Sequence, residues 1–335
     1  MPSLSKNQLL ERIIEAVNAS GWNVVYEADM SDHPFKLKIY NQDTLLKLKI
    51  YIWNITHGGY PRSAQEYRIQ VKLDRNVGRF EPEPGWNMLI LGWWEDGGVF
   101  AGFDHRMHSG HVAWSASFQI RLEALEQAHI NGFAPSDKGN GEIAVAFSPE
   151  YFIEYITHVT AFHSFGESRP DFDMLEAVVA NQLVNDQDLE RVSVQRRTAL
   201  RTIRQSLRDH SFTNRVLTAY SNRCAFCDIQ LKLIEAAHIL PVSYEGSTDE
   251  TSNGIALCAL HHKAYDKALI TFNQRYQIIH NESKMTHLRQ IGHDGGMDRF
   301  IRDLKPLINV PPAGRDRPYI NYIADANELR GWELE

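Results

Sequence analysis

The sequence is poor in cysteine and has no long apolar run. Its only cysteines are Cys224, Cys227 and Cys258, which fall within one short segment. An odd number of clustered cysteines argues against the disulfide framework of a secreted protein and favours metal ligation. No stretch reaches the roughly 20 apolar residues that a membrane-spanning helix needs, and the N-terminus lacks the apolar region of a signal peptide. We therefore expect an intracellular, cytoplasmic protein without membrane contact.

Positive charge is scarce overall but concentrated in one segment. The formal net charge is −7, with 35 Lys and Arg against 42 Asp and Glu. This balance excludes indiscriminate coating of nucleic acid, because that affinity comes from neutralised phosphates. The segment from Arg191 to Arg223 differs from the average, since it holds eight arginines, no lysine and a single acid, Asp209. This asymmetry indicates an acidic protein with one basic surface that has a function. The alternative is an arginine-rich helix that is simply exposed to solvent.

Length and hydrophobic patterning predict two domains. The chain has 335 residues, 43% hydrophobic and 23% charged, which suffices for two ordinary cores. Residues 6–19 place apolar side chains at helical spacing, which predicts an amphipathic opening helix. Runs of strand character follow at 22–26, 35–40, 45–55, 67–73, 88–94, 99–103 and 113–122, and glycine-rich breaks at 95–98 and 139–141 predict hairpins. We expect an α+β fold with a mixed-sheet domain at 1–180, an Arg-rich helical connection at 181–211 and a second domain at 212–335.

Four arginines share one face of the helix that is predicted in the connection. Arg197, Arg201, Arg204 and Arg208 lie at positions i, i+4, i+7 and i+11, and apolar residues form the opposite stripe. Guanidinium groups in such a row are suited to bind a row of phosphates. Phosphate contacts position a protein along a nucleic acid without recognising its base sequence. We therefore interpret these four arginines as candidate contacts to a nucleic-acid backbone.

The three cysteines belong to two pairs that have the spacing of metal ligands. Cys224-x-x-Cys227 is followed at a distance by Cys258-x-x-His261, so that two turns each present two ligands to one tetrahedral ion. These four residues predict a closed structural zinc site made of three thiolates and one imidazole.

A histidine and an asparagine lie between the two ligand pairs. A strand-like run ends in His238, a turn-rich loop follows, and Asn253 leads into a second apolar strand and then into a helix with His262 and Asp266. The last two residues are four apart, so a helix places both on one face, where together they are able to hold a divalent cation. His238, across the hairpin, is left free to deprotonate water.

This segment resembles the ββα-metal module of HNH endonucleases. The shared pattern is Cys-x-x-Cys, Glu-Ala-Ala-His-Ile-x-Pro and Asn-Gly-x-x-Leu-Cys-x-x-His-His, within residues 212–280. The resemblance implies that His238 is the general base that activates the attacking water and that His262 ligates a catalytic magnesium or manganese ion. It also implies that Asn253 ties the hairpin loop together and orients the catalytic imidazole.

The chain departs from that pattern at one position. Many HNH enzymes place an aspartate just before the first histidine as a metal ligand, whereas this chain has Ala237. We expect Asp266 to substitute as the ligand, with Glu235 as a second candidate, and further oxygens come from water and the scissile phosphate.

The resemblance also implies a substrate and a biological setting. We expect a restriction-type or antiviral defence endonuclease that acts on double-stranded DNA, with target selection by the N-terminal domain. Cutting both strands needs two oppositely oriented centres, so we expect a homodimer. One alternative is an effector nuclease that degrades DNA nonspecifically once its front domain binds a signal molecule. Another is a zinc-containing DNA-binding protein that does not cleave.

Two groups of residues outside the module invite functional readings. His105, His108 and His111 are evenly spaced, but we interpret them as part of a polar surface loop and not as a ligand cluster. Trp93 and Trp94 suit a pocket for an extruded base, but core packing is the more common role of tryptophan in a sheet domain.

Overall fold

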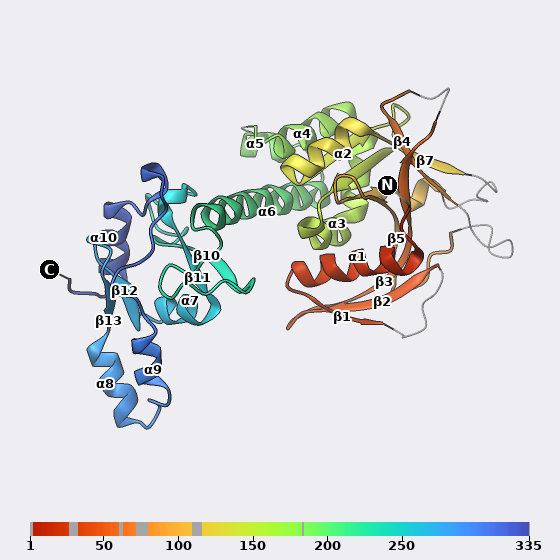
Figure 1. Ribbon diagram of the computed structural model, residues 1–335. Coiled ribbons are helices and arrows are strands. Elements are labelled where there is room, and N and C mark those ends of the chain that lie inside the picture. Colours follow the sequence, from red (N-terminus) through yellow and green to blue (C-terminus); the bar gives the residue numbers. More distant parts are fainter. Residues whose placement is uncertain are drawn as a thin grey trace. The chain divides into compact units, whose positions relative to one another are not determined.

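The computed structural model describes residues 3–26, 33–59, 63–71, 80–108, 116–182 and 184–334. It divides the chain into two compact units, Met1–Leu207 and Arg208–Glu335. The division falls inside the long helix α6 (Val194–Ala219), which is labelled in Figure 1. The predicted connection at 181–211 contains the short helix α5 (Asp186–Leu189) and the first part of α6. Within the described ranges, no helix is both long and apolar enough to traverse a bilayer.

Among its described residues, the N-terminal unit is built on a nine-stranded mixed sheet. Its main path is β1-β2-β3-β5-β6-β9-β8, while β4 pairs with β3 and β7 pairs with β4. The neighbours β3 and β5 are parallel, and the other pairs are antiparallel. The strands are β1 (Asn23–Tyr26), β2 (Phe35–Tyr40), β3 (Leu45–His57), β4 (Glu66–Gln70), β5 (Asn87–Trp94), β6 (Val99–Phe103), β7 (Ser117–Arg121), β8 (Phe133–Asp137) and β9 (Ile143–Phe147). This arrangement confirms the predicted mixed-sheet α+β unit.

Both predicted hairpins are present. Trp94 pairs with Val99 across the turn between β5 and β6, and Asp137 pairs with Ile143 between β8 and β9. The predicted strands at 67–73 and 113–122 correspond to β4 and β7, and residues 72, 73 and 113–115 lie outside the described residues.

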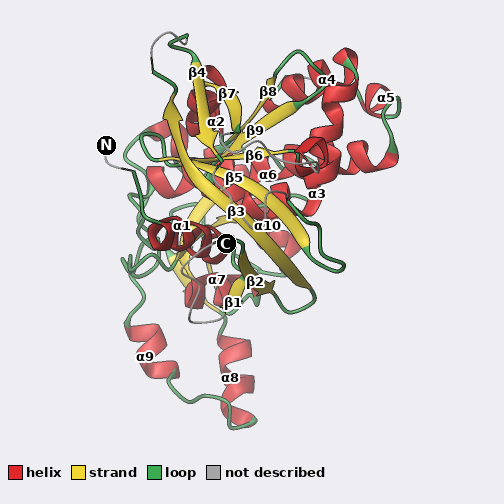
Figure 2. Cartoon of the chain, turned by 90° about the vertical axis from the view of Figure 1, so that its right-hand side faces the viewer, coloured by secondary structure: helices red, strands yellow, loops and turns green. Residues whose placement is uncertain are grey.

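Helices cover both faces of this sheet (Figure 2). One core lies between the sheet and the helices α1 (Lys6–Ala19), α3 (Phe152–Ser164) and α4 (Arg169–Val179). The other lies between the opposite face and α2 (Leu122–Asn131). Side chains of β5 alternate between the two, with Leu89, Leu91 and Trp93 in the first and Met88, Ile90 and Trp94 in the second. Trp93 and Trp94 are therefore core residues. The described part of this unit also contains the short 3-10 helices η1 (His105–His108), η2 (Pro149–Tyr151) and η3 (Phe165–Glu167).

A buried histidine joins the sheet to α3. The Nδ1–H of His163 donates to the carbonyl of Ile143 at 2.9 Å, and its Nε2 accepts from the hydroxyl of Tyr155 at 2.9 Å. Burial lowers the pKa of His163 to about 4. Of the three evenly spaced histidines, His105 and His108 lie in η1, and His108 pairs with Glu142, while His111 lies outside the described residues.

The C-terminal unit begins with the second part of α6 and continues as strand, strand, helix. The antiparallel strands β10 (Ile234–His238) and β11 (Gly254–Cys258) pair so that His238 faces Gly254 and Ile234 faces Cys258. Helix α7 (Ala259–Asp266) follows directly. This is the ββα order that the sequence predicts. The remaining elements are η4 (Thr251–Asn253), β12 (Ile270–Phe272), β13 (Ile278–His280), α8 (Glu282–Gln290), α9 (Met297–Arg302), η5 (Gly314–Asp316) and α10 (Ile320–Leu329).

Helix α6 contributes to a core in each unit. Leu200 and Ile203 belong to the core of the N-terminal unit. Phe212 and Val216 belong to the core of the C-terminal unit, together with residues of β11 and α7. The apolar stripe predicted for this helix belongs to the first of these cores, and Phe212 and Val216 join α6 to the second.

Candidate active site and zinc centre

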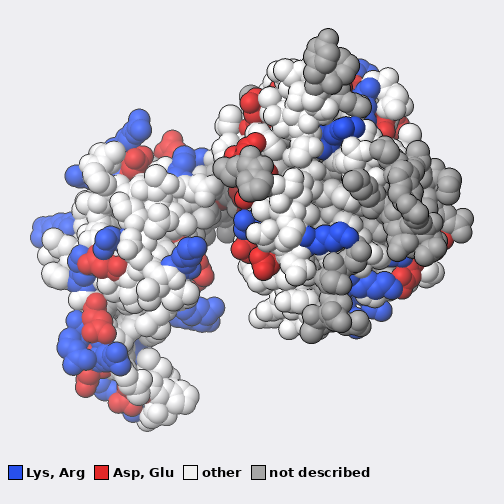
Figure 3. All heavy atoms as spheres, turned by 45° about the vertical axis from the view of Figure 1, so that its right-hand side comes forward, with Lys and Arg blue, Asp and Glu red and all other residues white. Residues whose placement is uncertain are grey.

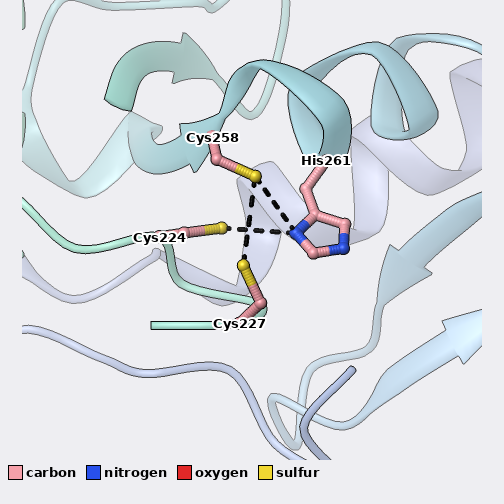
Figure 4. Close-up of side chains that lie close together, drawn as sticks. All are labelled: Cys224, Cys227, Cys258 and His261. Atoms are coloured by element: carbon pink, nitrogen blue, oxygen red, sulfur yellow. Dashed lines mark hydrogen bonds between the residues drawn. The ribbon is translucent and has the colours of Figure 1, made fainter. Parts of the chain in front are cut away.

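Three sulfurs and one imidazole nitrogen converge in the C-terminal unit (Figure 4). The four ligand atoms of Cys224, Cys227, Cys258 and His261 all lie within 4.8 Å of one another. Cys227 Sγ is 3.9 Å from Cys258 Sγ, and His261 Nδ1 is 3.5 Å from Cys224 Sγ and 3.4 Å from Cys258 Sγ. Tetrahedral zinc with bonds of about 2.1 to 2.3 Å separates its ligands by roughly 3.5 Å. The cluster therefore fits a structural zinc ion.

Two parts of the chain position these ligands. Cys224 and Cys227 lie in the turn after α6, which is tied to β11 by the hydrogen bond from Ala225 N to Ala256 O, at 2.7 Å. Cys258 ends β11, and His261 lies in the first turn of α7. The hydrogen bond from the Cys227 thiol lowers the pKa of Cys224, although burial opposes it. A thiolate is therefore favoured at Cys224, as metal binding requires.

His238 is held on two sides at the end of β10. Its ring stacks on Phe212 of α6, with centroids 3.8 Å apart and planes 6° from parallel. Its Nε2 lies 3.2 Å from Oδ1 of Asp249. The imidazole is 19% exposed, so it is accessible from one side and packed on the other.

Asp249 is the residue of this site that the sequence did not single out. Besides His238, it accepts a hydrogen bond from Arg208 Nε at 3.0 Å, and its carbonyl accepts one from Arg215 Nη2 at 2.6 Å. Burial alone would raise the pKa of Asp249, but the hydrogen bonds from Arg208 and His238 outweigh burial and lower it. An ionised carboxylate only accepts, so His238 Nε2 carries a proton, and in the neutral imidazole Nδ1 keeps its lone pair. The signal that points to Asp249 is its place in the loop that Asn253 closes.

Asn253 is fully buried and holds the loop between β10 and β11. Its Oδ1 accepts from Leu240 N at 2.9 Å, and its Nδ2 lies 2.9 Å from Thr248 O and 3.1 Å from both Leu240 O and Ser247 Oγ. These bonds span both ends of the loop, and Asp249 follows Thr248 directly. Asn253 therefore determines where the carboxylate beside His238 lies.

Gly254 permits α6 to approach this hairpin closely. A Cβ at Gly254 would lie 2.2 Å from Cγ2 of Val216 and 3.1 Å from the ring of Phe212. The absence of a side chain at Gly254 therefore lets Phe212 reach the face of His238.

His262 lies between two carboxylates. Its Nδ1 is 2.5 Å from Glu235 Oε2, and its Nε2 is 3.8 Å from Asp266 Oδ2. Asp266 is one turn further along α7, whereas Glu235 reaches across from β10. The imidazole is 26% exposed, and the carboxylates of Glu235 and Asp266 are 55% and 51% exposed. Carboxylate oxygens together with one imidazole suit a hard divalent cation that retains water ligands.

The four arginines predicted to contact phosphate differ in their surroundings. Arg197 Nη1 is 3.5 Å from Glu190 Oε1, and Arg204 is half-buried. Arg208 is bound to Asp249. Arg201 is exposed, and no hydrogen bond or ion pair engages it within the described residues. On the face drawn in Figure 3, Lys and Arg side chains form separate patches with Asp and Glu between them.

An open depression of about 540 Å³ lies beside Asp249 in the C-terminal unit. It is lined by Arg215, Asp249, Glu250, Thr251, Ser252, Arg315 and Asp316. Two arginines therefore face the space next to the carboxylate that holds His238.

Two family models match separate parts of the chain. Residues 46–156 match the family described as Methylase-associated X1, and residues 224–273 match the family described as HNH endonuclease. Among solved structures, the chain is similar to one titled "Modification dependent TagI restriction endonuclease", with 11% identity, a TM-score of 0.28 and coverage of 84% of this chain and 80% of that chain. No curated protein matches the chain. The HNH match contains the zinc ligands, His238, Asn253 and His262. Residues 224–273 are therefore an HNH endonuclease domain, and the chain that carries them is a nuclease of the HNH type.

Proposed function

We propose that this chain is a DNA endonuclease of the restriction or defence type that hydrolyses phosphodiester bonds with one divalent cation, Mg²⁺ or Mn²⁺. The observation that carries the proposal is the geometry of His238, which is stacked on Phe212 and hydrogen-bonded to Asp249 within the HNH domain. His262, with Asp266 or Glu235, would hold the cation. When bound, the cation polarises the scissile phosphate and stabilises the leaving oxygen.

The chain's own residues account for the activation of water. Nδ1 of His238 accepts a proton from the attacking water, because Nε2–H is already donated to Asp249. The ionised carboxylate of Asp249 then stabilises the imidazolium that forms. Phe212 restricts rotation of the ring, and Asn253 keeps Asp249 in place. Together these contacts fix both the tautomer and the direction of the general base.

DNA contact is assigned to the arginines and target selection to the N-terminal unit. Arg201 is free to meet a phosphate, and Arg215 and Arg315 line the depression beside Asp249. Arg197 and Arg204 extend the row, whereas Arg208 would exchange the carboxylate of Asp249 for a phosphate. The match of residues 46–156 to a methylase-associated family supports a restriction setting, in which the N-terminal unit selects the target.

Cleavage of both strands of a duplex would require a homodimer, because one centre of fixed orientation serves one strand polarity. We place the protein in the cytoplasm, where it would act on invading double-stranded DNA. Sedimentation of the protein with a cognate duplex tests the dimer, and a cleaving monomer would contradict it.

Plasmid cleavage with Mg²⁺ or Mn²⁺ tests the proposed activity. His238→Ala should lose at least about a hundredfold in cleavage rate, since general-base catalysis contributes roughly that factor or more. His280→Ala is a matched control, because His280 is also a partly exposed histidine paired with a carboxylate in the same unit. DNA binding and folding of His238→Ala should match the wild type. Wild-type cleavage rates in His238→Ala would refute the assignment of the base.

The choice of substrate separates the alternatives. Bare, methylated and hydroxymethylated DNA should be cut at different rates if the N-terminal unit selects the target. Equal cutting of all three only after a small molecule is added would favour a signal-activated effector nuclease. Binding without any cutting would favour a non-cleaving zinc protein.

A further inference from the structure

The HNH domain lacks the aspartate that would normally precede the catalytic histidine. Position 237 is an alanine that is 5% exposed and packs in the core of the C-terminal unit. An alanine offers no oxygen to a cation, so a ligand oxygen must come from another residue. The following inference rests on the proposed function and asks which residue replaces that aspartate.

Glu235 occupies the same side of β10 as Ala237. Side chains alternate along a strand, so residues i and i+2 point to one face of the hairpin, about 7 Å apart. Within this strand Glu235 pairs with Leu257, next to the start of α7. Its carboxylate reaches α7, with Oε2 at 2.5 Å from Nδ1 of His262. A carboxylate two residues away on the same face is therefore already in contact with the family's metal-binding histidine.

The two carboxylates near His262 lie at different nitrogens of its ring. Glu235 is at Nδ1, and Asp266 is at Nε2, 3.8 Å away. One imidazole gives one nitrogen to a metal, and its other N–H is normally donated to a carboxylate, a carbonyl or water. Adjacent ligands on an octahedral ion with bonds of about 2.1 Å are roughly 3 Å apart. The Glu235 pair is closer to that spacing than the Asp266 pair.

We propose that Glu235 supplies the metal-ligating carboxylate that Ala237 cannot supply, and that it holds the catalytic cation together with Nδ1 of His262. Asp266, whose Oδ2 lies 3.8 Å from Nε2, then faces the N–H on the other side of the ring and orients it by charge. Glu235 and His238 belong to the same five-residue strand. The two residues lie three positions apart on that strand.

Manganese binding to the zinc-loaded, full-length protein without DNA tests this assignment. Electron paramagnetic resonance of free Mn²⁺ gives the affinity for each variant. Glu235→Gln should weaken Mn²⁺ binding about a hundredfold, and Asp266→Asn should weaken it about tenfold, as loss of a residue that orients a ligand does. Both side chains are more than half exposed, so neither change removes core packing. Thermal unfolding of each variant checks this.

A matched control is present in the same unit. His280 and Glu282 form another surface pair, with Nε2 and Oε1 2.6 Å apart. Glu282→Gln should leave Mn²⁺ affinity unchanged, which would show that a surface pair of histidine and glutamate is not sufficient to bind the cation. Wild-type affinity in Glu235→Gln, or a larger loss in Asp266→Asn than in Glu235→Gln, would overturn the inference.

One further variant separates failure of this inference from failure of the proposed function. If His262→Ala abolishes Mn²⁺ binding but Glu235→Gln does not, the cation site stands and only the role of Glu235 is wrong. If His262→Ala binds Mn²⁺ like the wild type, the cation site of the proposed mechanism is wrong as well.

Discussion

Replacing Asn253 with alanine should release the loop between β10 and β11. The side chain is fully buried, and its amide bonds to Leu240 and Thr248 at opposite ends of the loop. Alanine leaves at least the Leu240 N–H and the Thr248 carbonyl without these partners. Leu240 is buried, so its unsatisfied N–H costs about 1 to 3 kcal/mol, whereas Thr248 is exposed and water can satisfy its carbonyl. We therefore expect a total loss of up to about 3 kcal/mol.

Hydrogen exchange measured by mass spectrometry checks this value locally. Because each 1.4 kcal/mol corresponds to a factor of ten, exchange of the Leu240 amide in Asn253→Ala should be up to about a hundredfold faster. Asn273→Ala is the control, since Asn273 Oδ1 accepts hydrogen bonds from Arg275 N and Gln277 N at an exposed turn. That change should leave Leu240 protected. Unchanged Leu240 protection in Asn253→Ala would refute the argument that this side chain closes the loop.

Three other changes have defined outcomes. Cys258→Ser should release zinc and unfold the ββα segment, because structural zinc contributes folding free energy; a folded variant without zinc by elemental analysis would contradict the closed site. Gly254→Ala forces a Cβ to within 2.2 Å of Val216. We therefore expect the free energy of unfolding, measured by thermal unfolding, to fall by about 1 to 3 kcal/mol, and cleavage to become slower as Phe212 shifts. Wild-type stability and cleavage rate would exclude the close approach. The pKa of His163 is about 4 in the folded protein, against 6.5 for an ordinary histidine. Its contribution to the free energy of unfolding is therefore complete above pH 6.5 and falls by up to about 3 kcal/mol as the pH drops to 4. His163→Gln should flatten this pH dependence in denaturant unfolding, and an equally steep profile would count against it.

Most strands of the N-terminal unit were predictable from the sequence, but their pairing was not. Apolar runs identified β1 to β7, and glycine-rich breaks identified the β5–β6 and β8–β9 hairpins, because local periodicity and turn residues specify these features. The strands β8 and β9 themselves were not predicted. Strand β3 pairs in parallel with β5, and β4 pairs with both β3 and β7. These pairings depend on contacts between distant segments. Hydrophobic alternation does not encode such partners.

The same division applies to the active site. Ligand spacing predicted the residues that form the Cys224–His261 cluster, and family resemblance pointed to His238 and Asn253. Asp249 was missed because its role comes from a loop that folds back on β10, and an aspartate in a polar loop has no distinctive pattern. The preference for Glu235 over Asp266 likewise depends on which ring nitrogen of His262 each carboxylate meets, and sequence spacing says nothing about that.

The sharing of α6 between two hydrophobic cores determines how this protein can be dissected. Leu200 and Ile203 are buried in the N-terminal unit, and Phe212 and Val216 in the C-terminal unit. A nuclease fragment that starts before residue 200 would contain Leu200 and Ile203 without the core that buries them. These apolar side chains would be exposed to solvent and would promote aggregation. A fragment that starts after Phe212 would lose the aromatic ring that supports His238. Leu207 also packs against the N-terminal core, so the break that spares both cores lies between Leu207 and Phe212, where the two units divide.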